Sequence, residues 1–328
     1  MALKRIKRIA LLTSGGDAPG MNAAIRAVVR HGLYHNLEIM GIYNGYQGMI
    51  ENHFELMDRQ SVSNIIQRGG TILKSARSKY FKTDEGMEKA WNNLLEHNID
   101  ALVVIGGDGT FTGAKIFGEK YDFPIVGLPG TIDNDLYGTD LTIGYDTAVN
   151  TVVQAVDKIK DTASSHDRLF FVEVMGRDAG FIALNSGLAV GAHNILVPET
   201  RTYIDNLIRM LKHDWKMNKS SGIIIVAEGD DEGGAYEIAA KVKDKLPDYD
   251  TRVTILGHIQ RGGAPSANDR ILASLLGYDA VSTLLNGNRG VMVGMVNNKI
   301  AYTPFSQSIK YHNEINRNLL EIARLLSL

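Results

Sequence analysis

One stretch of the sequence decides the fold: ALVVIGGDGT, at residues 101–110. Its first five residues are apolar, which indicates a β-strand covered on both faces, and glycines with an aspartate and a threonine follow at once. The same succession of a short apolar run and a polar, mostly glycine-rich loop recurs along the chain. The apolar runs are residues 9–13, 101–105, 125–128, 169–174, 195–197, 223–227 and 253–256.

Apolar residues at helical spacing lie between these runs. The helical stretches are residues 22–34, 86–96, 147–160, 203–215, 235–243 and 269–285, and a last helix is expected at 314–326. Strands that alternate with helices predict parallel β/α/β layers. Because ligands bind outside the carboxyl ends of parallel strands, we expect the polar loops to gather along one rim.

The length and composition limit the class of protein. At roughly 150 residues per domain, 328 residues suggest two lobes. With 44% hydrophobic and 22% charged residues, the chain is an ordinary globular protein, so disorder, collagen and coiled coil are excluded. A formal net charge of −2 argues against a nucleic-acid partner.

The absence of cysteine and of long apolar runs bears on the compartment. Without cysteine there are no disulfides, thiolate nucleophiles or Cys-ligated zinc, which is consistent with a reducing compartment, and the cytoplasm is expected. The apolar stretch at residues 9–12 is too short for a signal peptide. No run approaches the roughly 18 residues of a membrane span, so no membrane partner is expected.

Two glycine-rich loops are suited to phosphate and metal. Gly15 and Gly16 let the backbone approach an anion at the start of the helix near residue 22, although a tight turn is the alternative. Asp108 can hold a hydrated Mg²⁺ against phosphate oxygens, or it can cap a turn or helix. Neither GxxxxGK[ST] nor GxGxxG occurs in the chain.

The loop PGTIDND, at residues 129–135, carries two carboxylates. Phosphoryl transfer needs a carboxylate that orients the attacking hydroxyl and accepts its proton, while cations neutralise the phosphoryl oxygens. Asp133 and Asp135 meet that need, with an Asx-rich turn as the alternative.

Basic residues near strand ends indicate the acceptor. They are Arg168, Arg177, Arg252, Arg261 and His258. Grouped guanidinium groups suit an acceptor that already carries phosphate. Taken singly, each arginine is more often a solvated surface residue or an ion-pair partner, and His258 is equally well explained as a hydrogen-bonded structural histidine.

Six segments together resemble the bacterial 6-phosphofructokinase family, of the phosphofructokinase A type. They are TSGGDAPGMNAAIR at 13–26, GGDGT at 106–110, PGTIDND at 129–135, DTASSHDR at 161–168, MGRDAG at 175–180 and LGHIQRGG at 256–263. The resemblance implies an α/β fold of two Rossmann-like three-layer α/β/α lobes with mostly parallel sheets. The nucleotide lobe would be residues 1–143 with 257–307, and the fructose-6-phosphate lobe 144–256 with 308–328.

The implied reaction moves the γ-phosphoryl group of MgATP to the 1-hydroxyl of fructose 6-phosphate, which gives fructose 1,6-bisphosphate and ADP in glycolysis. By family likeness Asp133 is the base, with Thr131 beside it and Asp135 close by, and Arg177 stabilises the moving group. Mg²⁺ would be served by Asp108. The matching ATP positions are Gly15, Tyr46, Arg77, Asp108, Gly109 and Thr110.

The resemblance also implies contacts to the sugar phosphate. Those within the subunit would be Thr131, Asp133, Met175, Gly176, Arg177, Glu228, His258 and Arg261. Arg168 and Arg252 match arginines that family members offer to the neighbouring subunit, so a homotetramer is expected.

The phosphoryl donor can be argued from two glycines. Pyrophosphate-dependent relatives carry Asp where Gly109 stands and Lys where Gly130 stands, so ATP is favoured here. The alternatives are a pyrophosphate-dependent enzyme, an NAD or lipid kinase that shares GGDGT, and a catalytically silent sugar-phosphate sensor. The sensor is disfavoured because Asp108, Asp133 and Arg177 are all present.

An effector pocket for ADP or phosphoenolpyruvate is a further expectation from the family. The corresponding residues are Arg26, Arg30, Arg59, Lys160 and Lys219, although a solvated helix face also explains Arg26 and Arg30. The chain departs from the family with Lys160 for Arg, Asn64 for Asp, Met217 for Lys and His193 for a metal-binding Glu, so we expect a weak or altered response. Lys74 has no assigned role.

Overall fold

The chain folds into two compact units. The computed structural model describes residues 6–165, 168–216 and 222–326. Unit 1 comprises Met1–Ile132, Leu136–Thr147 and Arg261–Asn313, and unit 2 comprises Asp133–Asp135, Ala148–Gln260 and Glu314–Leu328. The units therefore divide the chain near residues 147, 260 and 313, whereas the resemblance places the divisions at 143, 256 and 307.

Unit 1 is built on a seven-stranded sheet with the order β11-β10-β5-β4-β1-β2-β3. The strands are β1 (Arg8–Thr13), β2 (Glu38–Ile42), β3 (Phe54–Met57), β4 (Ala101–Gly106), β5 (Ile125–Pro129), β10 (Val291–Val296) and β11 (Lys299–Pro304). All neighbours are parallel except the edge pairs β2–β3 and β10–β11. Thr13 pairs with Ile105 and Gly106 with Pro129, so the loops after β1, β4 and β5 leave the sheet at one edge.

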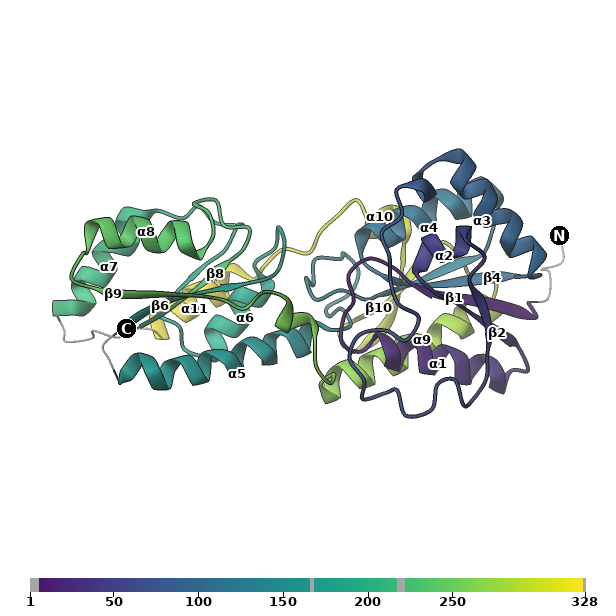
Figure 1. The fold of residues 1–328 in the computed structure, drawn as a ribbon, viewed down its shortest axis with the longest axis horizontal. Helices are drawn as coiled ribbons and strands as arrows, with labels where there is room; N and C mark the ends of the chain where they lie inside the picture. Colours follow the sequence, from purple (N-terminus) through teal and green to yellow (C-terminus); the bar gives the residue numbers. More distant parts are fainter. Residues whose placement is uncertain (1–5, 166–167, 217–221, 327–328) are drawn as a thin grey trace. The chain divides into compact units, whose positions relative to one another are not determined.

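Helices cover both faces of this sheet (Figure 1). They are α1 (Met21–Tyr34), α2 (Gly45–Ile50), α3 (Asp84–Glu96), α4 (Asp108–Tyr121), α9 (Ala267–Leu285) and the short α10 (Phe305–Ser308), with the 3₁₀ turn η1 (Tyr80–Lys82). α1 and α9 pack together on one face, and α2, α3 and α4 bury Leu12 and Val104 on the other. α3 begins at a cap, because the Thr83 hydroxyl accepts a hydrogen bond from the Gly86 amide at 3.1 Å.

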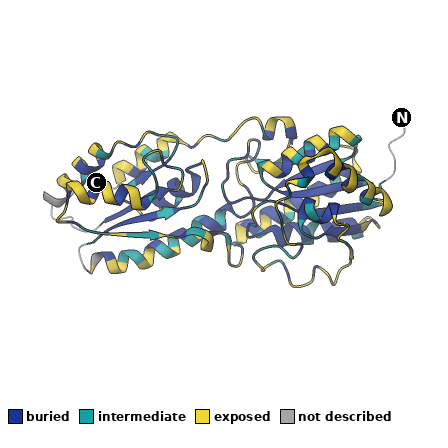
Figure 2. Cartoon of the chain, turned by 45° about the horizontal axis from the view of Figure 1, so that its top comes forward, coloured by how far each residue is buried: buried dark blue, intermediate teal, exposed yellow. Residues whose placement is uncertain are grey.

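Unit 2 contains a wholly parallel four-stranded sheet with the order β7-β8-β6-β9. The strands are β6 (Arg168–Val174), β7 (Asn194–Leu196), β8 (Gly222–Ala227) and β9 (Asp250–Ile255); the helices are α5 (Tyr145–Ser164), α6 (Phe181–Ala189), α7 (Ile204–Lys216), α8 (Ala235–Lys245) and α11 (Arg317–Leu326), with the 3₁₀ turn η2 (Gly257–Arg261). α7 and α8 cover one face, and their Leu207 and Ile238 pack on Phe171. Figure 2 shows the resulting pattern, in which β6 and β8 are mostly buried, the edge strand β9 is only partly buried, and the outer helix faces are exposed.

The predicted α/β architecture with mainly parallel sheets is confirmed, and each of the seven predicted strands is present. The polar loops are divided between the two sheets: three follow strands of unit 1 and four follow strands of unit 2, so their gathering along one rim stays a prediction. The last helix begins at Arg317 rather than at residue 314. Within the described ranges, none of the helices combines the length and apolar character needed to cross a membrane.

Candidate active site

The loops after β1 and β4 are fastened to each other in unit 1. The Thr110 hydroxyl donates a hydrogen bond to the main-chain oxygen of Ser14 at 3.1 Å. A Cβ on Gly106 would lie 2.4 Å from that same oxygen, so only glycine allows this approach. Gly15 has φ +87°, a left-handed conformation that favours glycine. The predicted phosphate loops therefore form one continuous glycine-lined surface.

Asp108 is the first residue of α4, on this surface. Its Oδ1 atom is buried and has no hydrogen-bond partner among the described residues. A buried carboxylate oxygen without a donor is suited to a hard cation such as Mg²⁺. In the part of the chain that the structure describes, no three His, Asp or Glu side chains form a metal cluster. A Mg²⁺ ion at Asp108 would thus take its other ligands from water and phosphate oxygens.

Tyr46 and Arg77, two of the predicted nucleotide contacts, differ in exposure. Tyr46 is buried, stacks on Phe81 with 4.1 Å between ring centroids, and donates a hydrogen bond to the Thr110 main-chain oxygen at 2.7 Å. Burial raises the pKa of its hydroxyl, which stays protonated. Tyr46 therefore supports the first turn of α4 from within the core. Arg77, in contrast, is exposed on a surface loop.

The two glycines that bear on donor choice have opposite surroundings. A Cβ on Gly109 would meet no atom within 4 Å. A Cβ on Gly130 would lie 2.9 Å from Ile105 Cγ2 and 3.0 Å from Met21 Cε. A side chain is accommodated at Gly109 without moving the protein, whereas one at Gly130 displaces the core beneath the loop.

The loop that carries the predicted base contains the point at which the chain passes from unit 1 to unit 2. Thr131 is buried in unit 1, and its main-chain oxygen accepts a hydrogen bond from the Thr142 hydroxyl at 2.6 Å. Asp133 and Asp135 are half-buried and belong to unit 2, and Asn134 between them has φ +56°. Since Asp108 belongs to unit 1, its meeting with Asp133 in one pocket stays a prediction.

In unit 2 the loop after β6 is held by the loop after β8. One oxygen of Glu228, Oε1, accepts hydrogen bonds from the main-chain amides of Gly176 at 3.2 Å and Arg177 at 2.7 Å. A Cβ on Gly229 would lie 2.3 Å from the Arg177 carbonyl oxygen, so the two loops touch backbone to backbone. Arg177 has φ +56°, and its exposed guanidinium lies 3.4 Å from the Asp178 carboxylate.

Gln260 also supports this loop and is not among the site residues predicted from the sequence. Its side chain is fully buried: Oε1 accepts a hydrogen bond from the Met175 amide at 3.2 Å, and Nε2 donates to the Gly257 carbonyl at 3.0 Å. An amide between the two predicted contacts His258 and Arg261 was the available signal. His258 itself is exposed on η2.

Arg261, a predicted sugar-phosphate contact, lies against the loop after β1 in unit 1. Its Nη1 donates a hydrogen bond to the Asp17 main-chain oxygen at 3.2 Å, and a Cβ on Gly16 would lie 2.6 Å from the same nitrogen. The guanidinium therefore adds positive charge beside the glycine-lined surface of Ser14 and Thr110.

Arg168 and Arg252 lie near the amino ends of β6 and β9, whereas the loop with Arg177 follows the carboxyl end of β6. Arg168 is the first residue of β6 and pairs in register with Asp250, the first residue of β9. Arg177 follows the opposite end of β6. At about 3.3 Å a residue, the strand separates the two ends by roughly 20 Å. Arg168 and Arg177 of one chain thus lie beyond opposite ends of the same strand, β6.

The predicted effector residues are placed in part. Arg26 and Arg30 lie one turn apart on α1, and burial, followed by the charge of Arg30, lowers the pKa of Arg26. The Lys160 ammonium donates a hydrogen bond to the Val190 carbonyl. His193 Nδ1 accepts one from the Ile223 amide at 3.2 Å.

The other residues named for the effector pocket offer less. Arg59 is exposed in the loop after β3, and Asn64 has φ +54°. Lys219 and Met217 lie outside the described residues.

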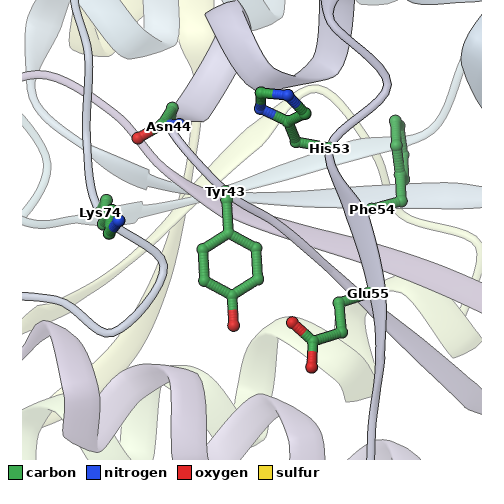
Figure 3. Close-up of a pocket in the computed structure, with 6 residues that line it drawn as sticks. All are labelled: Tyr43, Asn44, His53, Phe54, Glu55 and Lys74. Carbon is green, nitrogen blue, oxygen red and sulfur yellow. The ribbon is translucent and has the colours of Figure 1, made fainter.

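A cavity of about 490 Å³ opens in unit 1, and its lining contains none of the predicted site residues (Figure 3). It is lined by Tyr43, Asn44, His53, Phe54, Glu55 and Lys74. Burial and a hydrogen bond to the Glu55 carboxylate raise the pKa of Tyr43. Lys74 has φ +56°, and its main-chain oxygen accepts a hydrogen bond from the Thr13 hydroxyl at 2.7 Å, so its backbone is fixed at the end of β1.

Residues 8–284 match the family model described as Phosphofructokinase. The ATP-dependent 6-phosphofructokinase 2 of Bacteroides thetaiotaomicron is 55% identical over 323 residues, which are 98% of this chain and 99% of that protein. The ATP-dependent 6-phosphofructokinase of Cytophaga hutchinsonii is 56% identical over 322 residues, 98% of each chain.

Solved structures resemble the chain as well. Phosphofructokinase of Saccharomyces cerevisiae matches with a TM-score of 0.88 and 40% identity, covering 93% of this chain and 45% of that longer chain. The pyrophosphate-dependent phosphofructokinase of Marinobacter aquaeolei matches with a TM-score of 0.83 over 97% of this chain and 91% of that one, but at 23% identity it shows the shared fold alone.

Proposed function

The chain belongs to the phosphofructokinase family, and from this premise we propose that it is an ATP-dependent 6-phosphofructokinase of glycolysis. It transfers the γ-phosphoryl group of ATP to the 1-hydroxyl of fructose 6-phosphate, giving fructose 1,6-bisphosphate and ADP. The function predicted from the six motifs is confirmed, because relatives of that description are more than half identical over 98% of the chain. As a glycolytic enzyme, it is proposed to act in the cytoplasm.

The structural observation that carries the assignment to this site is the orphaned Oδ1 atom of Asp108 on the glycine-lined surface. Asp108 would hold the Mg²⁺ that accompanies ATP, with Gly15, Gly109 and Thr110 beside the phosphates. When bound, that ion neutralises charge on the phosphoryl oxygens. Tyr46 supports this surface from below, through its hydrogen bond to Thr110.

The chemistry on the acceptor side is proposed for the 129–135 and 175–180 loops. Asp133 would accept the proton of the 1-hydroxyl as it attacks, with Thr131 and Asp135 holding the loop around it. Arg177 would stabilise charge on the moving phosphoryl group. The contacts to the sugar phosphate would be Met175, Gly176, Glu228, His258 and Arg261.

A second copy of the chain is part of the proposal. Arg168 lies at the amino end of β6, roughly 20 Å from the loop that carries Arg177, so it cannot serve the same sugar phosphate within one subunit. Arg252, on the neighbouring strand β9, lies near the same edge. We propose that both arginines complete the site of a neighbouring subunit in a homotetramer.

An effector response is the remaining proposal. Arg26 and Arg30 lie one turn apart on α1, and the charge of Arg30 helps to lower the pKa of Arg26, which suits an anionic ligand such as ADP or phosphoenolpyruvate. Replacement of a carboxylate by His193 and of arginine by Lys160 weakens such a pocket. We propose a weak response, and fructose 6-phosphate saturation curves with millimolar effector test it: a strong shift in half-saturation contradicts it.

The Asp133→Asn variant tests the catalytic assignment. We expect kcat to fall by about 10²-fold or more, because the amide cannot accept the proton, while fructose 6-phosphate still binds. Asp140→Asn, an exposed aspartate in the following loop, is the control and should keep near-normal turnover. Undiminished kcat in the Asp133→Asn enzyme would refute the assignment of the base.

A further inference from the structure

We propose that Asp250 is a positioning residue that holds Arg168 and Arg252 as a pair, ready to bind the sugar phosphate in the site of a neighbouring subunit. The inference rests on the proposed function and adds to it a residue that the six motifs do not contain. It follows from one carboxylate that contacts both guanidinium groups at the amino edge of β6 and β9.

The geometry of the three side chains is specific. Arg168 Nε donates to Asp250 Oδ2 at 2.9 Å, and Arg252 Nη1 pairs with the other carboxylate oxygen, Oδ1. The parallel register places Asp250 directly beside Arg168, so the contact is built into the pairing of β6 with β9. Arg252 is fixed further, since its Nη1 donates a hydrogen bond to the main-chain carbonyl of the preceding residue, Thr251, at 3.1 Å.

The charges explain why a carboxylate is needed between the arginines. Two guanidinium groups at one edge of a sheet repel each other and would point apart. The hydrogen bond from Arg168, with the charges of Arg252 and Lys243, lowers the pKa of Asp250, so its negative charge is present at neutral pH. The group of three keeps a net charge of +1, and a phosphate dianion is still attracted to it.

The N–H donors of Arg168 that do not bond to Asp250 indicate which kind of ligand the arginine can bind. The hydrogen bond from Arg168 to Asp250 runs through Nε, which leaves the N–H groups of Nη1 and Nη2 outside that hydrogen bond. A guanidinium carries five N–H donors, and a phosphate takes two of them at once in a parallel fork. Asp250 therefore uses one edge of the Arg168 guanidinium and leaves the outer edge for phosphate oxygens.

Stability alone gives no reason for this arrangement. The side chains of Arg168, Asp250 and Arg252 are 27%, 39% and 47% exposed. Ion pairs this accessible to water add little to folding, so the value of the contact lies in where it holds the arginines.

The first experiment uses the full-length enzyme and steady-state kinetics. We expect Asp250→Asn to raise the KM for fructose 6-phosphate roughly tenfold, the effect of weakening one charge-assisted hydrogen bond, and to leave kcat and the KM for ATP within about twofold. Asp250→Glu should restore most of the affinity because it keeps the charge. Glu232→Gln breaks a comparably exposed pair with Lys241 and is the matched control.

Two results would overturn the proposal. An unchanged KM for fructose 6-phosphate in Asp250→Asn would show that the arginines need no carboxylate. A lowered KM would show that Asp250 competes with the phosphate instead of positioning its ligands. Melting temperature, expected to be unchanged, separates either result from a folding defect.

Mixed oligomers test whether the effect acts across the interface. Wild-type subunits are co-assembled with Asp133→Asn subunits, which are expected to be inactive, with or without Asp250→Asn on the inactive chain. A raised KM only when the inactive chain carries Asp250→Asn supports the proposal, and equal KM values overturn it. If the wild type does not turn over ATP with fructose 6-phosphate, the proposed function fails. Calorimetric measurement of fructose 6-phosphate binding to the Asp250→Asn and Asp250→Glu variants then still decides the role of Asp250.

Discussion

The hydroxyl of Thr110 donates a hydrogen bond across 3.1 Å to the main-chain oxygen of Ser14, so the first turn of α4 is fastened to the loop after β1. Both residues are buried, and the backbones approach closely only because residue 106 is glycine. This contact fixes the surface on which Asp108 presents its buried oxygen. The nucleotide side of the site thus depends on a hydrogen bond between the segments that follow two adjacent parallel strands, β1 and β4.

Replacing Thr110 by valine should therefore affect stability and ATP use together. Valine keeps the shape but leaves the Ser14 carbonyl unpaired, which costs about 1–3 kcal/mol. We expect urea unfolding to show that loss and the KM for ATP to rise. Thr110→Ser keeps the hydroxyl and should recover most of both. Equal stability of the valine and serine variants would contradict the role given to this hydrogen bond.

Gly109→Asp tests the choice of phosphoryl donor without disturbing the fold. A Cβ there meets nothing within 4 Å, and a carboxylate in the first turn of a helix is tolerated. Its charge beside Asp108 should repel the phosphates and raise the KM for ATP roughly tenfold or more, about 1.4 kcal/mol. Gly109→Ala is the control and should bind ATP almost normally.

The companion change Gly130→Lys is a poorer probe, because a Cβ at that position lies 2.9 Å from Ile105. The double variant Gly109→Asp, Gly130→Lys should also weaken ATP use, but part of its loss will come from the displaced core. Undiminished ATP turnover in either variant would disprove the donor argument.

Glu228→Ala should impair use of the sugar substrate more than use of ATP. The carboxylate accepts both amides of the turn that holds Arg177 at φ +56°, a conformation that costs a non-glycine residue about 1–3 kcal/mol. Without it we expect kcat/KM for fructose 6-phosphate to fall at least about tenfold. Glu228→Gln retains one acceptor oxygen and should lie between. A selective rise in the KM for ATP would argue against this assignment.

A pH dependence of stability is expected from His31, which stacks on Tyr278 at 3.9 Å and joins α1 to α9. Burial, opposed by the hydrogen bond to the Tyr278 carbonyl, lowers the pKa of His31 below 6.5. The folded protein then holds this ring neutral, so its contribution to stability is complete above about pH 6.5 and is lost as the pH falls through the folded value.

His31→Phe keeps the stacking and removes the titration. The difference in unfolding free energy between wild type and this variant should therefore shrink as the pH falls from 7 to 5, measured by urea unfolding. A difference that grows on acidification would show that His31 gains a proton more readily in the folded state.

The sequence predicted the central strands well because they are continuous apolar runs. Residues 101–105 and 223–227 are buried on both faces of their sheets, and their unbroken apolar sequence predicts this. Edge strands were harder. β9 begins at Asp250, three residues before the predicted run, because its first half is polar and only partly buried. α6 was missed since FIALNSGLA has almost no polar face at helical spacing.

The candidate site divides in the same way. Glycine-rich loops marked Asp108 and Arg177, because the residues that carry the chemistry are local in sequence. The supports of those loops depend on contacts distant in sequence: Glu228 meets Arg177 across 51 residues, and Asp250 meets Arg168 across 82. No local pattern encodes such contacts, so the register of β6 with β8 and β9 was needed to find them.

Phosphoryl transfer by the purified protein is the most direct test of the central claim. With fructose 6-phosphate and Mg²⁺ present, the rate of fructose 1,6-bisphosphate formation is measured with ATP and, separately, with pyrophosphate as the donor. We predict rapid turnover with ATP and little or none with pyrophosphate. Faster product formation from pyrophosphate than from ATP, or none from either donor, would contradict the account.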